Sequence, residues 1–320
     1  MNKEVSIIIP TKNEGDVLKN CLNSIQNLEY PKDKMEVIIV DAYSRDNTVE
    51  IAKKFGCKVV YENVGTRAGA CNIGVKNAKG EYIAFSDADC VLQKDWMKNL
   101  IKQFNDEKIA SVGGPNITPE DDTEFAKCVG AVLSFLSKPG ARYGLVADRV
   151  TWTFHNSGCN VAYRKNVIEE AGGFNNKLVT CEDEELDYRI REKGYNLLYT
   201  PDAVVYHYRR LTWKRFYKQA YKYAVGRMQA IKLHRKIGRW YNYTPPTIIS
   251  IIVILFALSF LNPIFPLIAF IILVSGGIGI GLMSLYLIST TKMEHFFTFL
   301  GLIIIWFFGY GTGMIRGLVK

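Results

Sequence analysis

The 320-residue sequence predicts an α/β fold with a mostly parallel sheet, followed by a membrane region. Over the first hundred residues, short apolar runs alternate with helical segments of ten to twelve residues, which is the pattern of successive βαβ units. The charge is divided between two regions. Residues 1–208 hold 26 Lys/Arg and 30 Asp/Glu (net −4), whereas residues 209–320 hold 14 Lys/Arg and one Glu (net +13). The second region also contains 51 consecutive uncharged residues, 241–291, which is too long for one membrane span.

The predicted strands are short and apolar, and polar residues follow the early ones. We place strands at 5–9, 35–40, 58–61, 80–89, 110–114 and 203–206. Asn13 is expected to cap a helix that reaches residue 25, and Asp46 or Asn47 a helix that reaches residue 55. Further helices are expected at 67–78, at 94–105 and from about 181 to 193, where Gly194 follows as the C-terminal cap.

Carboxylates and other polar groups follow three of these strands. Asp41 ends the second strand, Asp87 and Asp89 end the fourth, and Thr11–Glu14 follow the first. Ligands of open α/β sheets bind beyond the carboxyl ends of the strands, and Mg²⁺ binds one or two carboxylates together with phosphate oxygens. An Asp-rich turn is the simpler interpretation of Asp87–Asp89 taken alone. The convergence of several such groups favours a ligand that carries hydroxyls and phosphates.

Four stretches of this region resemble the nucleotide-sugar domain of the family 2 glycosyltransferases, inverting enzymes with the GT-A fold. They are SIIIPTKNE (6–14), VIIVDAYSRDNT (37–48), TRAGACNIG (66–74) and GEYIAFSDAD (80–89). The resemblance implies a nucleotide-diphosphate sugar as donor and a divalent metal, Mg²⁺ or Mn²⁺, as cofactor. The implied donor contacts are Pro10, Thr11, Asn13, Glu14, Asp41, Arg67 and Asp87.

By the same resemblance, Asp41 binds the nucleotide base, Asp87 lies by the ribose and the metal, and Asp89 ligates the metal that bridges the diphosphate. Two positions depart from the family pattern. Arg67 stands where many members have Lys, and Arg can bind a diphosphate bidentately. The sequence VDAYS (40–44) replaces VDDGS or VDGGS, a change that concerns the base pocket.

Four consecutive acids, residues 182–185, begin the helix predicted before Gly194. Acids at a helix N-terminus can simply complement the helix dipole. In the family that the sequence resembles, a Glu-Asp motif follows a Gly-Gly-Phe sequence, which here is residues 172–174. The resemblance implies that Asp183 is the general base that takes the proton of an acceptor hydroxyl, and that Glu182 contacts the acceptor.

Two further segments carry candidate residues. At the stretch TWTFHNSGCNVAY (151–163), Gly158 and Arg164 keep the spacing of a Gly-x-x-x-x-x-Arg sequence that helps to line the acceptor side in the family. Gly158 and Asn160 are therefore expected on the acceptor side, whereas His155 is expected to be a structural or surface histidine. His207 ends the last predicted strand, where some relatives use a histidine as a metal ligand. The sequence leaves that role and an ordinary strand-end histidine both open.

Residues 209–240 hold eleven Lys/Arg and no acid, interleaved with aromatic residues. Such a composition can bind nucleic acid. Its position directly before the uncharged run instead favours an amphipathic helix on an anionic membrane surface, with no nucleic-acid partner. Gln219, Lys222 and Tyr223 resemble the Gln-x-x-Arg-Trp motif that holds the acceptor in processive members. The replaced Arg and Trp favour transfer of one sugar over polymerisation.

The sequence therefore predicts three regions: a GT-A domain (1–208), a basic interfacial helix (209–245) and a transmembrane region (246–320) with spans at about 246–261, 264–289 and 296–315. The basic residues before the first span place the GT-A domain in the cytoplasm. An odd number of spans puts Arg316 and Lys320 outside, which is against the same rule. Gly277/Gly281 and Gly309/Gly313 are spaced for close helix packing.

The predicted function is that of a multi-pass protein of the cell membrane, a metal-dependent inverting glycosyltransferase. It is expected to move one sugar from a nucleotide-diphosphate sugar to a lipid-linked or membrane-borne hydroxyl acceptor at the cytoplasmic face. One alternative is a polyprenyl-phosphate sugar synthase, whose phosphate acceptor is already ionised and needs no general base. A second is a non-catalytic membrane scaffold of the same fold, which has no use for acids at Asp87, Asp89 and Asp183.

Overall fold

The computed structural model describes residues 3–137, 147–209 and 212–319, and the chain divides into two compact units. The first, here called the sheet unit, comprises the chain up to residue 122 together with 133–178 and 182–209. The second, here called the helical unit, comprises residues 123–132, 179–181 and the chain from residue 210 onward. Lys320, named in the topology argument above, lies outside the described residues.

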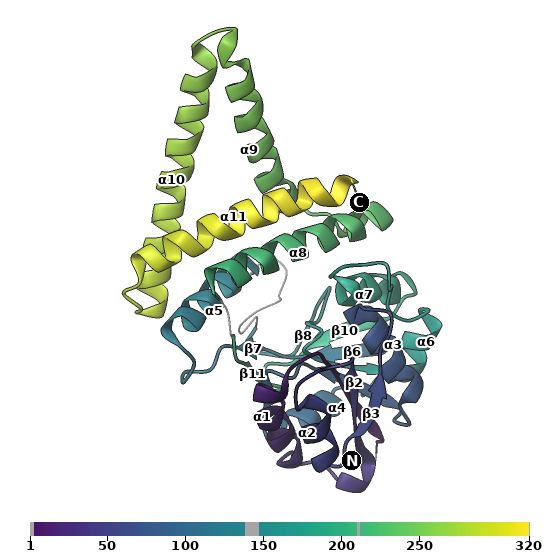
Figure 1. Cartoon of the computed structure of the whole chain (residues 1–320). Coiled ribbons are helices and arrows are strands. Elements are labelled where there is room, and N and C mark those ends of the chain that lie inside the picture. Colours follow the sequence, from purple (N-terminus) through teal and green to yellow (C-terminus); the bar gives the residue numbers. More distant parts are fainter. Residues whose placement is uncertain (1–2, 138–146, 210–211, 320) are drawn as a thin grey trace. The chain divides into compact units, whose positions relative to one another are not determined.

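The sheet unit is built on an eight-stranded, mostly parallel sheet in the order β3-β2-β1-β4-β9-β6-β10-β8 (Figure 1). Neighbours among β1 to β4 pair in parallel, as do β6 and β10, whereas β9 runs antiparallel to β4 and β6 and β8 runs antiparallel to β10. The strands are β1 (Val5–Thr11), β2 (Met35–Asp41), β3 (Lys58–Tyr61), β4 (Tyr82–Ser86), β6 (Ile109–Gly113), β8 (Thr151–Trp152), β9 (Asn160–Arg164) and β10 (Asn196–Tyr199).

Helices cover both faces of this sheet, which is why its inner strands are mostly apolar. Ile7 and Ile9 of β1 share one core with Leu18 of α1, while Ile8 between them packs in a second core with Val75 of α3. The helices of the region are α1 (Gly15–Gln26), α2 (Thr48–Lys54), α3 (Arg67–Asn77), α4 (Trp96–Ile101), α6 (Lys165–Glu170) and α7 (Glu182–Glu192), whereas α5 (Glu124–Ser137) lies for most of its length in the helical unit.

A second, three-stranded sheet in the order β5-β11-β7 fixes the position of His207. It consists of β5 (Cys90–Leu92), β7 (Asn116–Ile117) and β11 (Val205–His207). The strand expected over residues 80–89 is shorter than predicted, because β4 ends at Ser86 and Asp87–Asp89 form a turn before β5. In the antiparallel pairing of β11 with β5, His207 lies opposite Cys90, directly after that turn.

The expectation that Asn13 caps the first helix is wrong. Asn13 has a left-handed backbone (φ 55°), and Glu14 occupies the N-cap position of α1. Asn13 instead joins two loops, because its N–H donates to Ser44 Oγ (2.7 Å) and its Oδ1 accepts from the N–H of Arg45 (2.8 Å). The basic helix is also shorter than the predicted 209–245, since α8 (Trp213–Leu233) ends well before α9 begins at Trp240.

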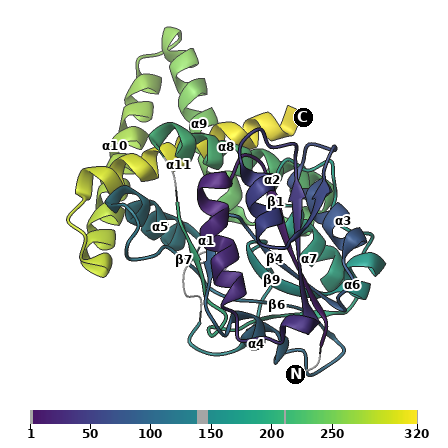
Figure 2. The same ribbon diagram turned by 60° about the horizontal axis from the view of Figure 1, so that its bottom comes forward.

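The helical unit contains three helices that are long and apolar enough to cross a membrane, as the sequence predicted. They are α9 (Trp240–Ala257, extended by one turn to Phe260), α10 (Ile264–Thr291) and α11 (Phe296–Val319). Of the most apolar window of each helix, 44% is buried by protein in α11 but only 6% in α9 and in α10. Figure 1 draws α9 and α10 as a hairpin, and α11 lies beside α8 in both views (Figures 1 and 2).

Glycines at four-residue intervals bring α11 against α8 along much of its length. A Cβ added to Gly309, Gly313 or Gly317 would come within 3.0 Å of an atom of α8. The nearest groups belong to Ala220, then Tyr221, then Met228, so the two helices run parallel. The expected packing of Gly309 and Gly313 is thus confirmed. Among the described residues, Gly277 and Gly281 meet nothing within 4 Å.

Candidate functional site

A pocket of about 240 Å³ lies at the edge of the sheet where β1 and β4 end. Parallel strands bring their carboxyl ends to the same edge, so segments far apart in the sequence meet there. The pocket is lined by Pro10, Glu14, Arg67, Asp87, Ala88, Asp89 and His207. Six of these seven are residues that the sequence predicted for donor or metal binding.

Arg67 connects this pocket to the acidic start of α7. Thr66 caps α3, its Oγ1 accepting from the N–H of Gly69 (3.0 Å), and this places Arg67 at the first helical position. Arg67 Nη2 donates to Asp87 Oδ1 and Nη1 to Glu182 Oε1, at 2.9 and 3.0 Å. Burial opposes the charge on the guanidinium, but the carboxylates around it raise the pKa of Arg67 further above its ordinary value. The planar fork of Arg suits such a bridge between two acids.

The turn Asp87–Asp89 and His207 form a set of groups that fits a divalent cation. The N–H of Cys90 donates to Asp87 O (3.1 Å) and closes the turn, and His207 Nε2 lies 3.2 Å from Asp89 Oδ1. Burial acts against the imidazolium, but Asp89 raises the pKa of His207 well above its ordinary value. Carboxylate oxygens are the ligands that Mg²⁺ and Mn²⁺ prefer, and imidazole is a common additional ligand of transition metals. The residues present therefore fit Mg²⁺ or Mn²⁺.

Gly158 joins Arg67 to Asp183 through its backbone. Its carbonyl accepts from Arg67 Nη2 (2.9 Å), and its N–H donates to Asp183 Oδ2 (3.0 Å). A Cβ on Gly158 would lie 2.8 Å from Arg67 Nη1 and 3.1 Å from Asp183 Oδ2, so a larger residue cannot fit without displacing one of them. The other oxygen of Asp183 accepts from the N–H of Glu184 (2.9 Å), at the start of α7. Asp183 is thus a fixed carboxylate behind the pocket.

Comparison with known proteins identifies the family. The chain matches the model of the family described as "Glycosyl transferase family 2" over residues 6–172. The chain belongs to glycosyltransferase family 2. The family 2 assignment makes it a glycosyltransferase and accounts for the pocket at the strand ends.

Two curated relatives and one solved structure support the assignment. The chain is 29% identical to the glycosyltransferase AglE of Haloferax volcanii over 72% of its length and 75% of that protein. It is 28% identical, over 70% of its length and 72% of the relative, to the dolichyl N-acetyl-alpha-D-glucosaminyl phosphate 3-beta-D-2,3-diacetamido-2,3-dideoxy-beta-D-glucuronosyltransferase of Methanococcus voltae. The mannosyltransferase PcManGT from Pyrobaculum calidifontis, solved with GDP-Man and Mn²⁺, superposes with a TM-score of 0.66 over 95% of this chain and 87% of that one. At 20% identity this likeness shows the fold, which is GT-A.

The region that departs from the family pattern, VDAYS, is built around a buried Asp41. Its Oδ1 accepts from the N–H of Ser44 (2.8 Å), and its Oδ2 accepts from the Ser44 hydroxyl (2.5 Å) and the Thr11 hydroxyl (3.2 Å). Tyr43 has a left-handed backbone (φ 55°), and its exposed ring stacks on Tyr61 at 5.3 Å between centroids. In this glycosyltransferase an aromatic pair thus stands beside the residue predicted to bind the nucleotide base.

Two residues predicted to contact the acceptor are held by other groups of the sheet unit. The side chain of Asn160 is fully buried, its Nδ2 donating to Pro115 O and Ala203 O (2.8 Å each) and its Oδ1 accepting from Trp96 Nε1 (2.7 Å). The prediction for Asn160 is therefore wrong, because β9 turns this side chain into the core. Glu182 is buried against Arg67, and burial together with Asp183 raises the pKa of its carboxyl.

The remaining predicted acceptor residues, Gln219, Lys222 and Tyr223, belong to the helical unit. Gln219 Nε2 donates to Tyr223 OH (3.1 Å), and Lys222 is exposed. Residues 179–181, which directly precede Glu182 in the chain, belong to the same unit and pack on α8. Thr180 Oγ1 donates to Lys222 O (3.1 Å), and a Cβ on Gly226 would lie 2.4 Å from Thr180 O.

Sequence reasoning missed the surroundings of Asp183 on its far side. His155, expected to be structural, lies with its Nε2 3.8 Å from Asp183 Oδ2, and its Nδ1 contacts Asp187. One signal was available, since Asp183 and Asp187 are four residues apart and so share one face of a helix. The pairing with His155 depends on the tertiary fold and has no local sequence signal.

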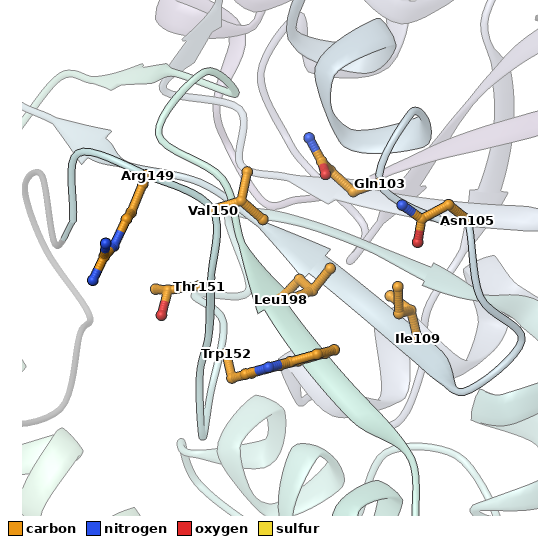
Figure 3. Close-up of a pocket in the computed structure, with 8 residues that line it drawn as sticks. All are labelled: Gln103, Asn105, Ile109, Arg149, Val150, Thr151, Trp152 and Leu198. Carbon is orange, nitrogen blue, oxygen red and sulfur yellow. The ribbon is translucent and has the colours of Figure 1, made fainter.

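A second pocket, of about 560 Å³, lies at the edge of the sheet around β8 (Figure 3). Its described walls are formed by Gln103, Asn105, Ile109, Arg149, Val150, Thr151, Trp152 and Leu198. None of these eight described residues is an acid or a histidine, whereas Asp87 and Asp89 line the pocket at the ends of β1 and β4.

Proposed function

We propose that this protein transfers a single sugar, with inversion, from a nucleotide-diphosphate sugar to a hydroxyl of a lipid-linked or membrane-borne acceptor. The observation that carries the proposal is the connection of one carboxylate-lined pocket to Asp183 through Arg67 and Gly158. A donor bound in that pocket has a fixed carboxylate within the same network of hydrogen bonds. This is the arrangement that inverting transfer requires.

The donor side is assigned to the ends of β1 and β2, the start of α3 and the Asp87–Asp89 turn. Its contacts are Pro10, Thr11, Asn13, Glu14, Asp41, Arg67 and Asp87, with Asp41 and the neighbouring Tyr43–Tyr61 pair near the base. Asp87, Asp89 and His207 would hold Mg²⁺ or Mn²⁺, which neutralises the charge of the departing diphosphate. Arg67 keeps its positive charge beside the same diphosphate, because two carboxylates surround it.

The acceptor side is assigned to Asp183. The acceptor hydroxyl oxygen forms a bond to the anomeric carbon as the bond from that carbon to the diphosphate oxygen breaks, and the hydroxyl proton passes to the Asp183 carboxylate. Hydrogen bonds from the N–H groups of Gly158 and Glu184 hold this carboxylate in one orientation. Gln219, Lys222 and Tyr223 of α8 are assigned to hold the acceptor. Glu182, by its ion pair with Arg67, orients the donor side as well.

The nature of the acceptor rests on the basic helix and on one relative. The 21-residue α8 carries six Lys/Arg and no acid, so it suits the surface of an anionic membrane at which a lipid-linked acceptor is found. The name of the Methanococcus voltae relative specifies a dolichyl-phosphate-linked sugar as its acceptor. We therefore propose a lipid-linked acceptor for this chain, reached at the cytoplasmic face of the cell membrane.

The packing of α11 bears on how this acceptor site meets the membrane. We propose that α9 and α10 cross the bilayer, whereas α11 lies along the membrane surface with α8. Because α11 runs parallel to α8 through Gly309, Gly313 and Gly317, the two helices have the same orientation, and the charges of α8 exclude a crossing orientation. With two spans, Arg316 lies on the same, cytoplasmic side of the membrane as the basic helix, in agreement with the positive-inside rule.

Reporter fusions to the C-terminus test this arrangement. Green fluorescent protein folds in the cytoplasm and alkaline phosphatase only outside it, so we expect fluorescence and no phosphatase activity from the full chain in a bacterial host. An active phosphatase fusion would place the C-terminus outside and restore three spans. Neither outcome depends on the sugar that is transferred.

Donor binding by the full detergent-solubilised chain tests the proposed function. Titration with UDP- and GDP-sugars, in Mn²⁺ or Mg²⁺ and again with EDTA, is expected to give metal-dependent binding of one nucleotide. Binding of none of them under any condition would favour the non-catalytic scaffold. Transfer to a polyprenyl phosphate that survives Asp183→Asn would favour the sugar-phosphate synthase, because an ionised phosphate needs no base.

A further inference from the structure

A buried histidine–aspartate pair lies directly behind Asp183. His155 precedes β9 and Asp187 lies on α7, and their side chains are 5% and 0% exposed. His155 Nδ1 and Asp187 Oδ2 are 2.8 Å apart. Burial of a carboxylate is costly unless charge and hydrogen bonds compensate it, so this pair is a feature that the fold must support.

Asp187 is fixed from three directions. Besides His155, its Oδ2 accepts from the N–H of Asn156 (2.9 Å), and its Oδ1 accepts from Tyr163 OH (2.9 Å). Asn156 in turn donates through Nδ2 to Ser111 Oγ and Leu198 O (3.1 Å each). A carboxylate held in this way fixes the imidazole ring that donates to it, and so determines where the other ring nitrogen points.

That other nitrogen faces the proposed base. His155 Nε2 lies 3.8 Å from Asp183 Oδ2, and it has no hydrogen-bond partner among the described residues. A buried donor without a partner is unusual in a structural role. The distance is within ion-pair range and slightly beyond a hydrogen bond, so a small movement of the carboxylate brings the two groups into contact.

We propose that His155, held by Asp187, is a positioning residue that keeps a positive charge beside Asp183 and so keeps this carboxylate ionised and ready to accept a proton. The inference rests on the proposed role of Asp183 as the general base. His155 does not touch the substrate in this proposal and acts only through Asp183.

The charges around the ring support an imidazolium. Burial disfavours the charged ring, but Asp183, the hydrogen bond to Asp187 and the more distant Glu184, all on α7, together raise the pKa of His155 above its ordinary value. From β9, Tyr163 reaches the ring only through Asp187, to which it donates. A cation near a carboxylate favours the ionised form of that carboxylate. The sign is therefore consistent: a positive ring beside Asp183 favours its ionised form, in addition to the charge of Arg67, which also interacts with Asp183.

The pH profile of kcat/KM for transfer tests the proposal, because it reports the ionisation of groups in the free enzyme. We compare the full wild-type chain with His155→Gln, in which an amide replaces the charged ring. Without the cation the acidic limb of the profile is expected to move to higher pH by about one unit, which corresponds to about a tenfold loss on that limb. The loss should shrink as the pH rises, since Asp183 is then ionised in both proteins. Donor binding should stay within about twofold of wild type.

A purely structural histidine predicts a different result. It would lower transfer by the same factor at every pH, or reduce donor binding as well, and a profile of unchanged shape would overturn the proposal. His295→Gln, in the helical unit, is the matched control and should leave the profile unchanged. If His155→Gln does not fold, Asp187→Asn is the second test of the proposal. Loss of this acid lowers the pKa of His155, so the acidic limb of the profile should again move to higher pH.

Asp183→Asn in the same assay tests the base role of Asp183 separately from the positioning role of His155. Transfer to a hydroxyl acceptor that survives Asp183→Asn would refute the base itself, and with it the proposed function. If Asp183→Asn abolishes transfer while His155→Gln keeps the wild-type profile, the base stands and only the inference about His155 fails.

Discussion

The proposed site contains two pairs of acids, and they differ in exposure. The side chains of Asp87 and Asp89 are 31% and 27% exposed, and they line a pocket. Those of Asp183 and Asp187 are 9% and 0% exposed, and His155 lies between them. Because clustered carboxylates repel one another, each pair needs a cation. Arg67 and His207 contact the exposed pair, which also faces a pocket where a metal and a donor could bind, whereas the buried pair is enclosed with His155.

This difference separates binding from chemistry. In the proposed function, a metal that binds together with the donor makes donor binding depend on that metal, whereas His155 keeps the proposed base Asp183 ionised before the substrate binds. Arg67 stands between the two pairs, with one nitrogen on Asp87 and another on Glu182, next to Asp183 in the chain. Substitutions on the two sides should therefore have effects that can be told apart.

Asp183→Asn is expected to have the largest effect on transfer. Loss of a general base costs on the order of 10²- to 10⁴-fold in rate, while the isosteric amide leaves the donor pocket unchanged. Single-turnover transfer and calorimetric donor binding measure the two effects separately. Glu192→Gln, on the exposed end of the same helix, is the control and should change neither the transfer rate nor donor binding. Equal losses of transfer and donor affinity would mean that the two sides are not separate.

Asp89→Ala is expected to act on the opposite side. Groups that merely support a metal ligand contribute about 10- to 100-fold in affinity, so loss of a direct ligand should weaken metal-dependent donor binding by about 100-fold. Titration of the nucleotide sugar with and without Mn²⁺ measures this loss of donor affinity, and the difference between the two titrations should disappear in the variant. Asp33→Ala, in the exposed turn before β2, is the control. Undiminished metal-dependent binding would remove Asp89 from the metal site.

Arg67→Lys should reduce both donor binding and transfer, because this side chain bridges the two sides. Lys has one ammonium group and cannot reproduce the planar fork that bonds Asp87, Glu182 and Gly158 together. Loss of one charge-assisted hydrogen bond costs about 1.5–3 kcal/mol, so we expect at least about a tenfold decrease in each measurement. Lys102→Arg, at a surface ion pair, is the control for a change of basic side chain. A decrease in donor binding alone, or in transfer alone, would show that Arg67 does not couple the donor side to the side of Asp183.

The sequence was sufficient for the fold and for most of the donor pocket. Buried parallel strands such as β1 are largely apolar runs, and strand-end acids converge wherever parallel strands share an edge, so Asp87 and Asp89 could be placed together in advance, with Asp41 at the end of β2. The remainder depends on tertiary pairing. The sequence predicts Asn160 on the acceptor side, but its position opposite Ser86 in the β4–β9 pair turns its amide into the core.

Helix packing was beyond the sequence for a similar reason. Hydropathy describes one helix at a time, so it identified α11 as apolar and long enough to cross a membrane without indicating that one face is covered by α8. The same limit applies to His155 and Asp187, which are 32 residues apart and meet only because β9 and α7 pack together. In both cases the missing information is which surfaces meet, and residue spacing within one element does not contain it.

Gly226→Ala tests whether the acceptor side extends into the helical unit, and its effect should be the smallest. A Cβ at this position would lie within 2.7 Å of three atoms of Thr180, and crowding of this kind costs about 1–3 kcal/mol when neighbours must move. Residues 179–181 lead directly into Glu182 and Asp183, so their displacement should lower transfer several-fold. Donor binding should be unchanged, because no donor residue lies in that segment. Gly276→Ala, with nothing within 4 Å of the added methyl group, is the matched control. If Gly226→Ala weakens donor binding as much as transfer, the anchoring of residues 179–181 on α8 serves the whole site and not the base alone.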